Sequence, residues 1–149
     1  PYGVMVPKEV DNLLLPVPVS GSHIGFSTLR MEPCWMAMGQ AAGIASALSI
    51  DGKVKVQNID LSRLQDKLID QKATLMYFKD VDYTSPHFRM VQYLGLRGYL
   101  PEWTARLQEP VDATTLAAWK KLSGTDLPGI EAGKTTRLAT LEMIYRKIK

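Results

Sequence analysis

A long uncharged run dominates the hydrophobic pattern of this chain. No charged residue occurs between Glu32 and Asp51, and the run is rich in glycine and alanine. A proline near its start suits the first turn of a helix, and Asp51-Gly52 is a strong turn signal. The pattern predicts a helix that begins at Met31 or Glu32 and ends near Ser49. Such a bare helix can lie very close to another backbone or to a flat ligand.

Shorter apolar segments on both sides of this helix predict extended structure. In the segment that starts at Leu13, the strand should end near Leu15, because the prolines that follow lack the amide donor that a central strand needs. Small and polar residues from Ser20 to Thr28 predict a loop that leads into the long helix. The extended segments are Tyr2 to Pro7, Leu13 to Val19, and Lys53 to Gln57.

The rest of the chain predicts four more helices, each with a capping residue and an apolar face. The caps are Asp60 or Asn58, Ser85 followed by Pro86, Asp112, and Thr135 or Thr136. Gly98 and Gly124 should end two of the helices. The residues predicted to face inward are Leu61, Leu64, Leu68 and Ile69; Phe88, Val91, Tyr93 and Leu94; Leu116, Trp119 and Leu122; and Leu138, Leu141, Ile144, Tyr145 and Ile148.

Taken together, these elements predict a mainly α fold with a few short strands. Residues 1–57 should form a strand–loop–helix segment, residues 58–74 a connecting helix, and residues 75–149 a three-helix module with its own apolar core. A chain of 149 residues can hold one domain, or one small domain plus part of another.

Four motifs follow one another in the first third of the chain. They are Asn12-Leu13-Leu14-Leu15, Ser20-Gly21-Ser22-His23, Arg30-Met31-Glu32-Pro33 and Gly39-Gln40-Ala41-Ala42-Gly43. In order and spacing they resemble the C-terminal flavin-binding segment of FAD-dependent oxidoreductases. Many members of that family have Ala-Gly-Arg after the strand, where this chain has Pro16-Val17-Pro18. The resemblance implies an incomplete C-terminal piece of an α/β FAD-binding domain, followed by a small helical bundle.

This resemblance implies FAD as the cofactor and assigns roles to named residues. His23 would face the isoalloxazine or the substrate and could shuttle a proton; a surface loop histidine is the alternative. Arg30 would orient the loop or neutralise charge, unless it only pairs with Glu32. The helix start near Cys34 would stabilise the negative charge of reduced flavin. The implied cofactor-binding residues are Ser20, Ser22, His23, Arg30, Gly39 and Gln40, with His23 also catalytic.

The sequence lacks the glycine-rich G-x-G-x-x-G turn that holds the ADP part of FAD in such enzymes. We therefore interpret the chain as the C-terminal part of a longer protein, with the remainder of the parent FAD domain as its partner. The isolated fragment should neither hold FAD nor be active.

The second half of the chain carries a different set of motifs. They are Phe78-Lys79-Asp80-Val81, Pro86-His87-Phe88, the helix end from Leu94 to Gly98, and Thr136-Arg137-Leu138-Ala139. This pattern resembles S-layer homology modules, which attach proteins to cell-surface polysaccharide. It implies an alternative function, a polysaccharide- or protein-binding helical module on a carbohydrate-processing enzyme, and a secreted or periplasmic bacterial location. A third possibility is that these helices only cover the flavin domain.

Charge and cysteine content argue against several other kinds of binding site. The net charge of +3 comes from 18 basic and 15 acidic residues that are interspersed, so the sequence has no basic stripe for nucleic acid. Cys34 is the only cysteine, which excludes an internal disulfide and a cysteine-only zinc site. No metal site is expected. The uncharged run is short and contains proline and glutamine, so we expect a buried helix and no membrane span.

Overall fold

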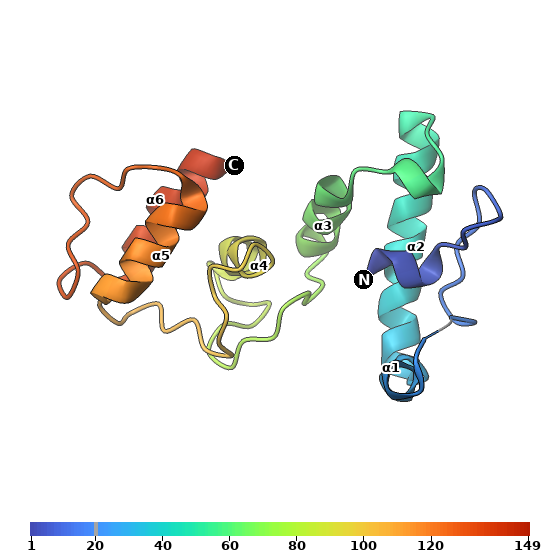
Figure 1. Cartoon of the computed structure of the whole chain (residues 1–149), viewed down its shortest axis with the longest axis horizontal. Coiled ribbons are helices and arrows are strands. Elements are labelled where there is room, and N and C mark those ends of the chain that lie inside the picture. The colour runs from blue at the N-terminus through green and yellow to red at the C-terminus, as the bar shows by residue number, and fades with distance from the viewer. Residues whose placement is uncertain (20) are drawn as a thin grey trace. The chain divides into compact units, whose positions relative to one another are not determined.

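A computed structural model describes residues 1–19 and 21–149 (Figure 1). Within these residues the only β-pairing is an isolated bridge, so the predicted mainly helical fold is confirmed. The chain divides into two compact units, Pro1–Ala73 and Thr74–Lys149. The first unit contains the 3-10 helices η1 (Tyr2–Met5) and η2 (Val56–Asn58) and the helices α1 (His23–Leu29), α2 (Glu32–Gly52) and α3 (Leu61–Asp70). The second unit contains α4 (Phe88–Gly95), α5 (Ala113–Ser123) and α6 (Arg137–Ile148).

Helix α2 is the axis of the first unit, and α1, α3, η1 and η2 all contact it (Figure 1). It begins at Glu32 with Pro33 in its first turn, as predicted. It ends at Gly52, three residues after the predicted end at Ser49, and Lys53 closes it in a left-handed conformation with φ 51°. The Asp51-Gly52 pair, which predicts a turn after the helix, therefore lies inside the last helical turn.

The segments predicted as strands are not strands in the structure. Tyr2 to Pro7 begins as the 3-10 helix η1, and Lys53 to Gln57 leads into the 3-10 helix η2. The segment from Leu13 to Val19 is irregular over its described residues. A strand is stable only when its backbone groups pair with a neighbour. Here the pairing is limited to single bonds, such as the one from the Leu15 amide to the Met5 carbonyl at 2.8 Å.

The predicted loop from Ser20 to Thr28 contains a helix instead. Ser22 caps α1, because its hydroxyl oxygen accepts a hydrogen bond from the Gly25 amide at 3.1 Å. Capping by serine compensates for the low helix propensity of Gly25. The sequence shows this serine, but the glycines around it favour a loop when the sequence is considered alone.

Tertiary hydrogen bonds tie the N-terminal segment to the region after α2. The Tyr2 hydroxyl donates to the Val56 carbonyl at 2.8 Å, and the Val56 amide donates to the Asn12 side chain at 3.2 Å. Below them, Met5, Val19 and Ala42 form a small buried cluster. Helix α3 covers another part of α2 and is capped by Asp60, as predicted.

In the second unit, the predicted caps explain where the helices begin. Asp112 caps α5 by accepting from the Thr115 amide at 2.8 Å, and Thr136 caps α6 by accepting from the Ala139 amide at 3.2 Å. Gly124 ends α5 in the left-handed conformation, with φ 59°. The Ser85-Pro86 pair forms a turn before α4, which starts at Phe88 and so later than predicted.

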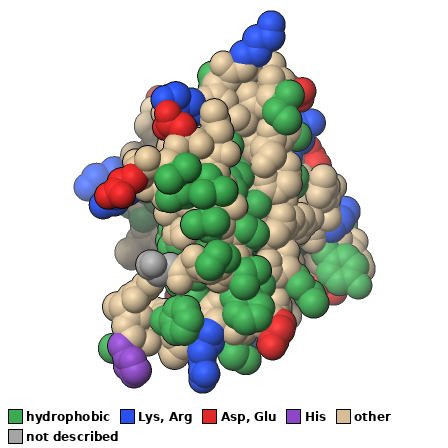
Figure 2. All heavy atoms as spheres, turned by 90° about the vertical axis from the view of Figure 1, so that its right-hand side faces the viewer, with side chains coloured by type: hydrophobic (Ala, Val, Ile, Leu, Met, Phe, Trp, Pro, Cys, Tyr) green, Lys and Arg blue, Asp and Glu red, His purple; other side chains and the backbone are tan. Residues whose placement is uncertain are grey.

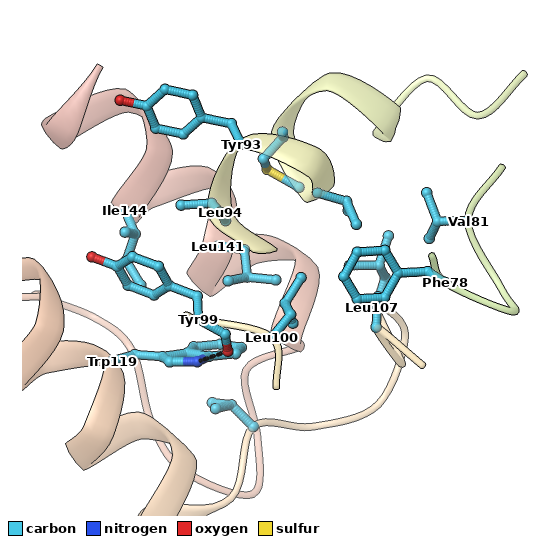
Figure 3. Packing of buried hydrophobic residues seen from close by; sticks show 14 of the residues in the cluster. Phe78, Val81, Tyr93, Leu94, Tyr99, Leu100, Leu107, Trp119, Leu141 and Ile144 are labelled. Atoms are coloured by element: carbon cyan, nitrogen blue, oxygen red, sulfur yellow. Dashed lines mark hydrogen bonds between the residues drawn. The ribbon is translucent and has the colours of Figure 1, made fainter. Parts of the chain in front are cut away.

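Most residues predicted to face inward are buried, three (Leu138, Tyr145 and Ile148) are partly buried, and two are exposed. Leu61 and Leu122 are exposed, because the first lies at the start of α3 and the second on the outer side of α5. Figure 3 shows the core of the second unit, in which the Trp119 indole donates to the Tyr99 carbonyl at 2.7 Å. The predicted inward residues that are fully buried are Leu64, Leu68, Ile69, Phe88, Val91, Tyr93, Leu94, Leu116, Trp119, Leu141 and Ile144.

Two loop segments of the second unit pair with each other just before α5 and α6. The isolated bridge joins Pro110 to Thr136 in antiparallel orientation. Backbone bonds extend it on both sides: the Val111 amide donates to Thr135, and the Leu138 amide donates to Leu107. We call residues 107–111 and 133–138 the paired loops. They fix where both helices begin.

Gln92 is a polar residue at the centre of α4, and it is fully buried. Its side-chain oxygen accepts from the amides of Leu75 and Met76, both at 2.8 Å. Its side-chain nitrogen donates to the Met76 carbonyl at 2.7 Å. One glutamine therefore satisfies three backbone groups of a segment that has no regular structure.

Candidate functional site

The predicted flavin-side residues lie around the two ends of α1. Ser22 caps the helix, His23 is its first residue, and Arg30 closes its C-terminal end. All three side chains are exposed. Within the described residues neither Arg30 nor Glu32 makes an ion pair, so the Arg30 guanidinium at the C-terminal end of α1 is not held by a carboxylate. Ser20 lies outside the described residues.

The other two predicted residues lie in the middle of α2. Gly39 and Gln40 are exposed, and the Gln40 side-chain nitrogen donates to the Gln71 side chain at 3.0 Å. They are about 10 Å along the helix from Glu32, at 1.5 Å per residue. Ser22 and Arg30 thus lie at opposite ends of one short helix that begins with His23, and Gly39 and Gln40 lie on the next helix.

An open stripe runs along α2. Met36, Gly43 and Ile50 are seven residues apart, so they lie on one side of the helix. Met36 is 75% exposed and Ile50 is 76% exposed. A side chain built at Gly43 would meet nothing within 4 Å. This side of an uncharged helix is therefore uncovered in the first unit.

The first turn of α2 carries fewer free donors than the sequence suggests. The amides of Cys34 and Trp35 both donate to the Met31 carbonyl, at 3.0 and 3.2 Å, and Pro33 has no amide hydrogen. The Trp35 indole nitrogen is different: it is buried and has no hydrogen-bond partner within the described residues. Buried indole donors are usually hydrogen-bonded, so this nitrogen is open to an acceptor such as a water molecule or another chain.

Other exposed apolar residues surround these elements. Figure 2 shows hydrophobic side chains gathered in the middle of the face that it presents, with charged side chains mostly at its edges. An apolar surface of this kind in a soluble protein usually marks an interaction site. The exposed large hydrophobic residues of the first unit are Val10, Leu13, Val17, Ile24, Phe26, Met31, Met36, Ile50, Val54 and Leu61.

A second candidate site is a pocket of about 350 Å³ in the second unit. Its most buried charged residue is Arg137, which is 9% exposed. The Arg137 Nε donates to the Ala105 carbonyl at 2.9 Å, and its guanidinium lies 4.9 Å from the centre of the Trp119 ring. Burial lowers the pKa of Arg137, and the charge of Arg106 lowers this pKa further. Arginine nevertheless stays protonated at neutral pH.

Carboxylates and hydroxyls complete the wall of this pocket. Glu102, Glu109 and Asp112 line it together with Thr115. Hydrogen bonds from the Thr115 hydroxyl and amide hold the pKa of Asp112 below its usual range. Sequence reasoning named Arg137 only within a motif and missed the pocket, because its walls come from segments 98–122 and 137, which only the fold brings together.

Residues 1–19 and 21–149 contain no group of three or more His, Cys, Asp and Glu side chains that could hold a metal ion. Within the same ranges, no helix combines the length and the apolar character that crossing a membrane requires.

Comparison with known proteins gives one match. Residues 1–68 match the family model described as FAD dependent oxidoreductase. The matched range contains α1, α2 and most of α3, and it ends before the second unit begins. No curated protein and no solved structure matches the chain.

Proposed function

We propose that residues 1–68 are the last flavin-contacting segment of an FAD-dependent oxidoreductase whose remaining FAD domain is the partner of this chain. The family match over this range supports the class of enzyme. The open stripe on α2 is the observation that carries the partnership. Between Glu32 and Asp51 this helix has no charged residue to keep any side of it in water, yet Met36 and Ile50 are exposed in the first unit.

In this proposal the dinucleotide sheet of the parent domain packs on the open stripe. Gly39 and Gly43 have free space above their backbones, so another backbone could approach closely there. The orphaned Trp35 indole would find its acceptor in the same partner. Packing on the stripe would remove from water an apolar surface that is costly to leave exposed.

The flavin would lie near α1 and the first turn of α2. His23 would be the catalytic residue, because histidine is the side chain that most often transfers protons in enzymes. Ser22 and Arg30 would contact the cofactor from the two ends of α1, with Ser20, Gly39 and Gln40 completing the binding set. When bound, FAD would supply the two-electron redox chemistry. The dipole of α2 would favour the negative charge that reduced flavin carries.

The isolated chain should not hold FAD, because the sequence contains no glycine-rich turn for the ADP part. A titration of the isolated chain with FAD, followed by flavin fluorescence, should therefore give no stoichiometric complex. We propose that activity likewise requires the remainder of the parent domain.

The decisive experiment is Gly43→Leu in the full-length protein. A branched side chain where a backbone should pack typically costs about 1–3 kcal/mol, so the variant should lose FAD or show a shifted flavin absorption. In the isolated chain the same change should be neutral or stabilising by about 0.5–1 kcal/mol, because it removes a glycine from an open helix face. Ala113→Leu, on the exposed first turn of α5, is the control and should leave the flavin unchanged. A full-length Gly43→Leu protein with full flavin occupancy and an unchanged spectrum would contradict the proposed packing.

A second function is proposed for residues 75–149, which resemble S-layer homology modules. In this proposal they bind a polysaccharide and so attach the oxidoreductase to the material it acts on or near. The pocket around Arg137 favours this function. The Arg137 guanidinium lines a pocket whose wall also carries carboxylates and threonine hydroxyls.

The pocket also indicates what kind of ligand it would take. Three carboxylates and two arginines line it, so donors and acceptors are mixed and neither sign of charge dominates. A ligand rich in hydroxyl groups can both donate to the carboxylates and accept from Arg137. The test is calorimetric titration of the chain with cellohexaose, chitohexaose and hexagalacturonate. If none of the three binds, this second function fails while the flavin proposal is unaffected.

A further inference from the structure

Two aromatic rings stand out from the surface of the second unit. Trp103 is 69% exposed and Tyr77 is 64% exposed. Their ring centres are 6.3 Å apart, and their planes are nearly perpendicular, at 89°. We call this pair the aromatic corner. Large aromatic side chains this exposed leave a substantial apolar area in water, which makes them candidates for a binding surface.

The backbone beneath the aromatic corner is firmly held. The Lys79 amide donates to the Trp103 carbonyl at 2.8 Å, which joins the two segments that carry the rings. The Asp80 carboxylate accepts from the amides of Ala105 and Arg106, at 2.8 and 2.7 Å. The rings are therefore carried by fixed positions, and binding to them would lose little conformational entropy.

The surroundings of the corner are polar. Glu102 and Thr104, the neighbours of Trp103 in the chain, both line the Arg137 pocket, and Glu102 forms an ion pair with Arg106. On the other segment, the neighbours of Tyr77 are turned inward: Phe78 is buried and Met76 packs against the core. The Trp103 ring is thus an apolar face whose two chain neighbours belong to the polar wall of the pocket, and the Tyr77 ring lies against it.

We infer that the aromatic corner stacks against a sugar ring of a saccharide chain. A pyranose has an apolar face of C–H bonds and a rim of hydroxyl groups, which matches an aromatic face beside polar side chains. A protein partner would instead require a broader continuous apolar patch, and Glu102, Thr104 and Arg106 interrupt any such patch here. This inference rests on the proposed polysaccharide-binding function and assigns it a separate contact outside the pocket.

The test is the same calorimetric titration with cellohexaose, chitohexaose and hexagalacturonate, repeated with variants of the full chain. For the hexasaccharide that wild type binds, Trp103→Ala should weaken binding about tenfold or more, as the loss of an aromatic anchor does. Trp103→Phe keeps a stacking face and should bind within about threefold of wild type. Tyr77→Ala should also weaken binding.

Tyr83→Ala is the matched control, because Tyr83 is similarly exposed, at 58%, but is not part of the corner. The affinity of Tyr83→Ala for the hexasaccharide should equal that of wild type. Equal affinities for Trp103→Ala and wild type would overturn the inference while the polysaccharide-binding function stands. Weakening by Tyr83→Ala as strong as that by Trp103→Ala would also overturn it, since the effect would then be general to exposed rings. If wild type binds none of the hexasaccharides, the inference falls together with the function on which it rests.

Discussion

Replacing Gln92 with leucine should destabilise the second unit although leucine is the more hydrophobic residue. The side chain is fully buried and bonds the amides of Leu75 and Met76 and the Met76 carbonyl. Leucine is one atom shorter and offers neither donor nor acceptor. The substitution therefore leaves three backbone groups without their partner, in a segment that no helix or sheet supports.

The size of the effect follows from these three groups. An unsatisfied buried polar group costs about 1–3 kcal/mol, and Leu75 and Met76 are only half buried, so about 2–5 kcal/mol is lost in total. Burying the additional apolar surface of leucine returns about 1–2 kcal/mol. The midpoints of these two ranges differ by about 2 kcal/mol, which is the expected net loss of unfolding free energy.

Urea denaturation followed by circular dichroism gives this difference directly. Gln108→Leu is the control, because it makes the same substitution at an exposed position of the same unit and should change stability by less than about 0.5 kcal/mol. Amide exchange at Leu75 and Met76 should accelerate in Gln92→Leu, since their acceptor is gone. If Gln92→Leu is as stable as wild type and these two amides exchange at the wild-type rate, the hydrogen bonds of Gln92 do not stabilise the unit as the geometry implies.

Two further predictions concern the second unit. Residues 75–149 expressed alone should melt cooperatively, because the core cluster from Phe78 to Ile144 lies wholly within them; a gradual, coil-like melt would show that this core needs the first unit. The lowered pKa of Asp112, caused by hydrogen bonds from Thr115, means that its stabilising effect is complete above the ordinary carboxyl range and is lost as the pH falls through the lowered value. Asp112→Asn keeps an acceptor for the Thr115 amide but no longer titrates, so acid unfolding of this variant between about pH 5 and pH 2 should be less steep than that of wild type. Identical acid-unfolding curves would exclude Asp112 as a contributor.

Local sequence signals predicted the helical part of the fold well. Asp60, Asp112 and Thr136 could be identified as caps because a cap acts within three residues of itself. Gly124 ends α5 for an equally local reason, since it adopts a left-handed conformation that other residues avoid. Such features need no knowledge of the rest of the chain.

Features that depend on distant partners could not be predicted in the same way. The segment from Leu13 to Val19 has the composition of a buried strand, but a strand forms only beside another strand, and the described residues provide none for it. Gln92 follows Val91 in an apolar helix, and nothing local indicates that two distant amides will meet it.

The candidate sites also differ in how far they could be predicted from the sequence. His23 and Arg30 were identified through a resemblance to a family, and their roles in flavin binding remain predictions. The Arg137 pocket and the aromatic corner are formed by residues that lie far apart in the sequence, and no local pattern indicates that Tyr77 and Trp103 come together.

The paired loops have a consequence for how this module can change during evolution. Because residues 107–111 and 133–138 hold the starts of α5 and α6 together, the segment between Gly124 and Gly133 is not needed to position either helix. Its tip at Pro128 and Gly129 is exposed, whereas Leu127 before it is buried in the core. Lengthening a flexible loop to twice its size adds only about 0.6 kcal/mol of closure entropy. Homologous modules should therefore accept insertions and deletions at this tip while they retain the residues of the paired loops and the spacing from Asp112 to Gly124.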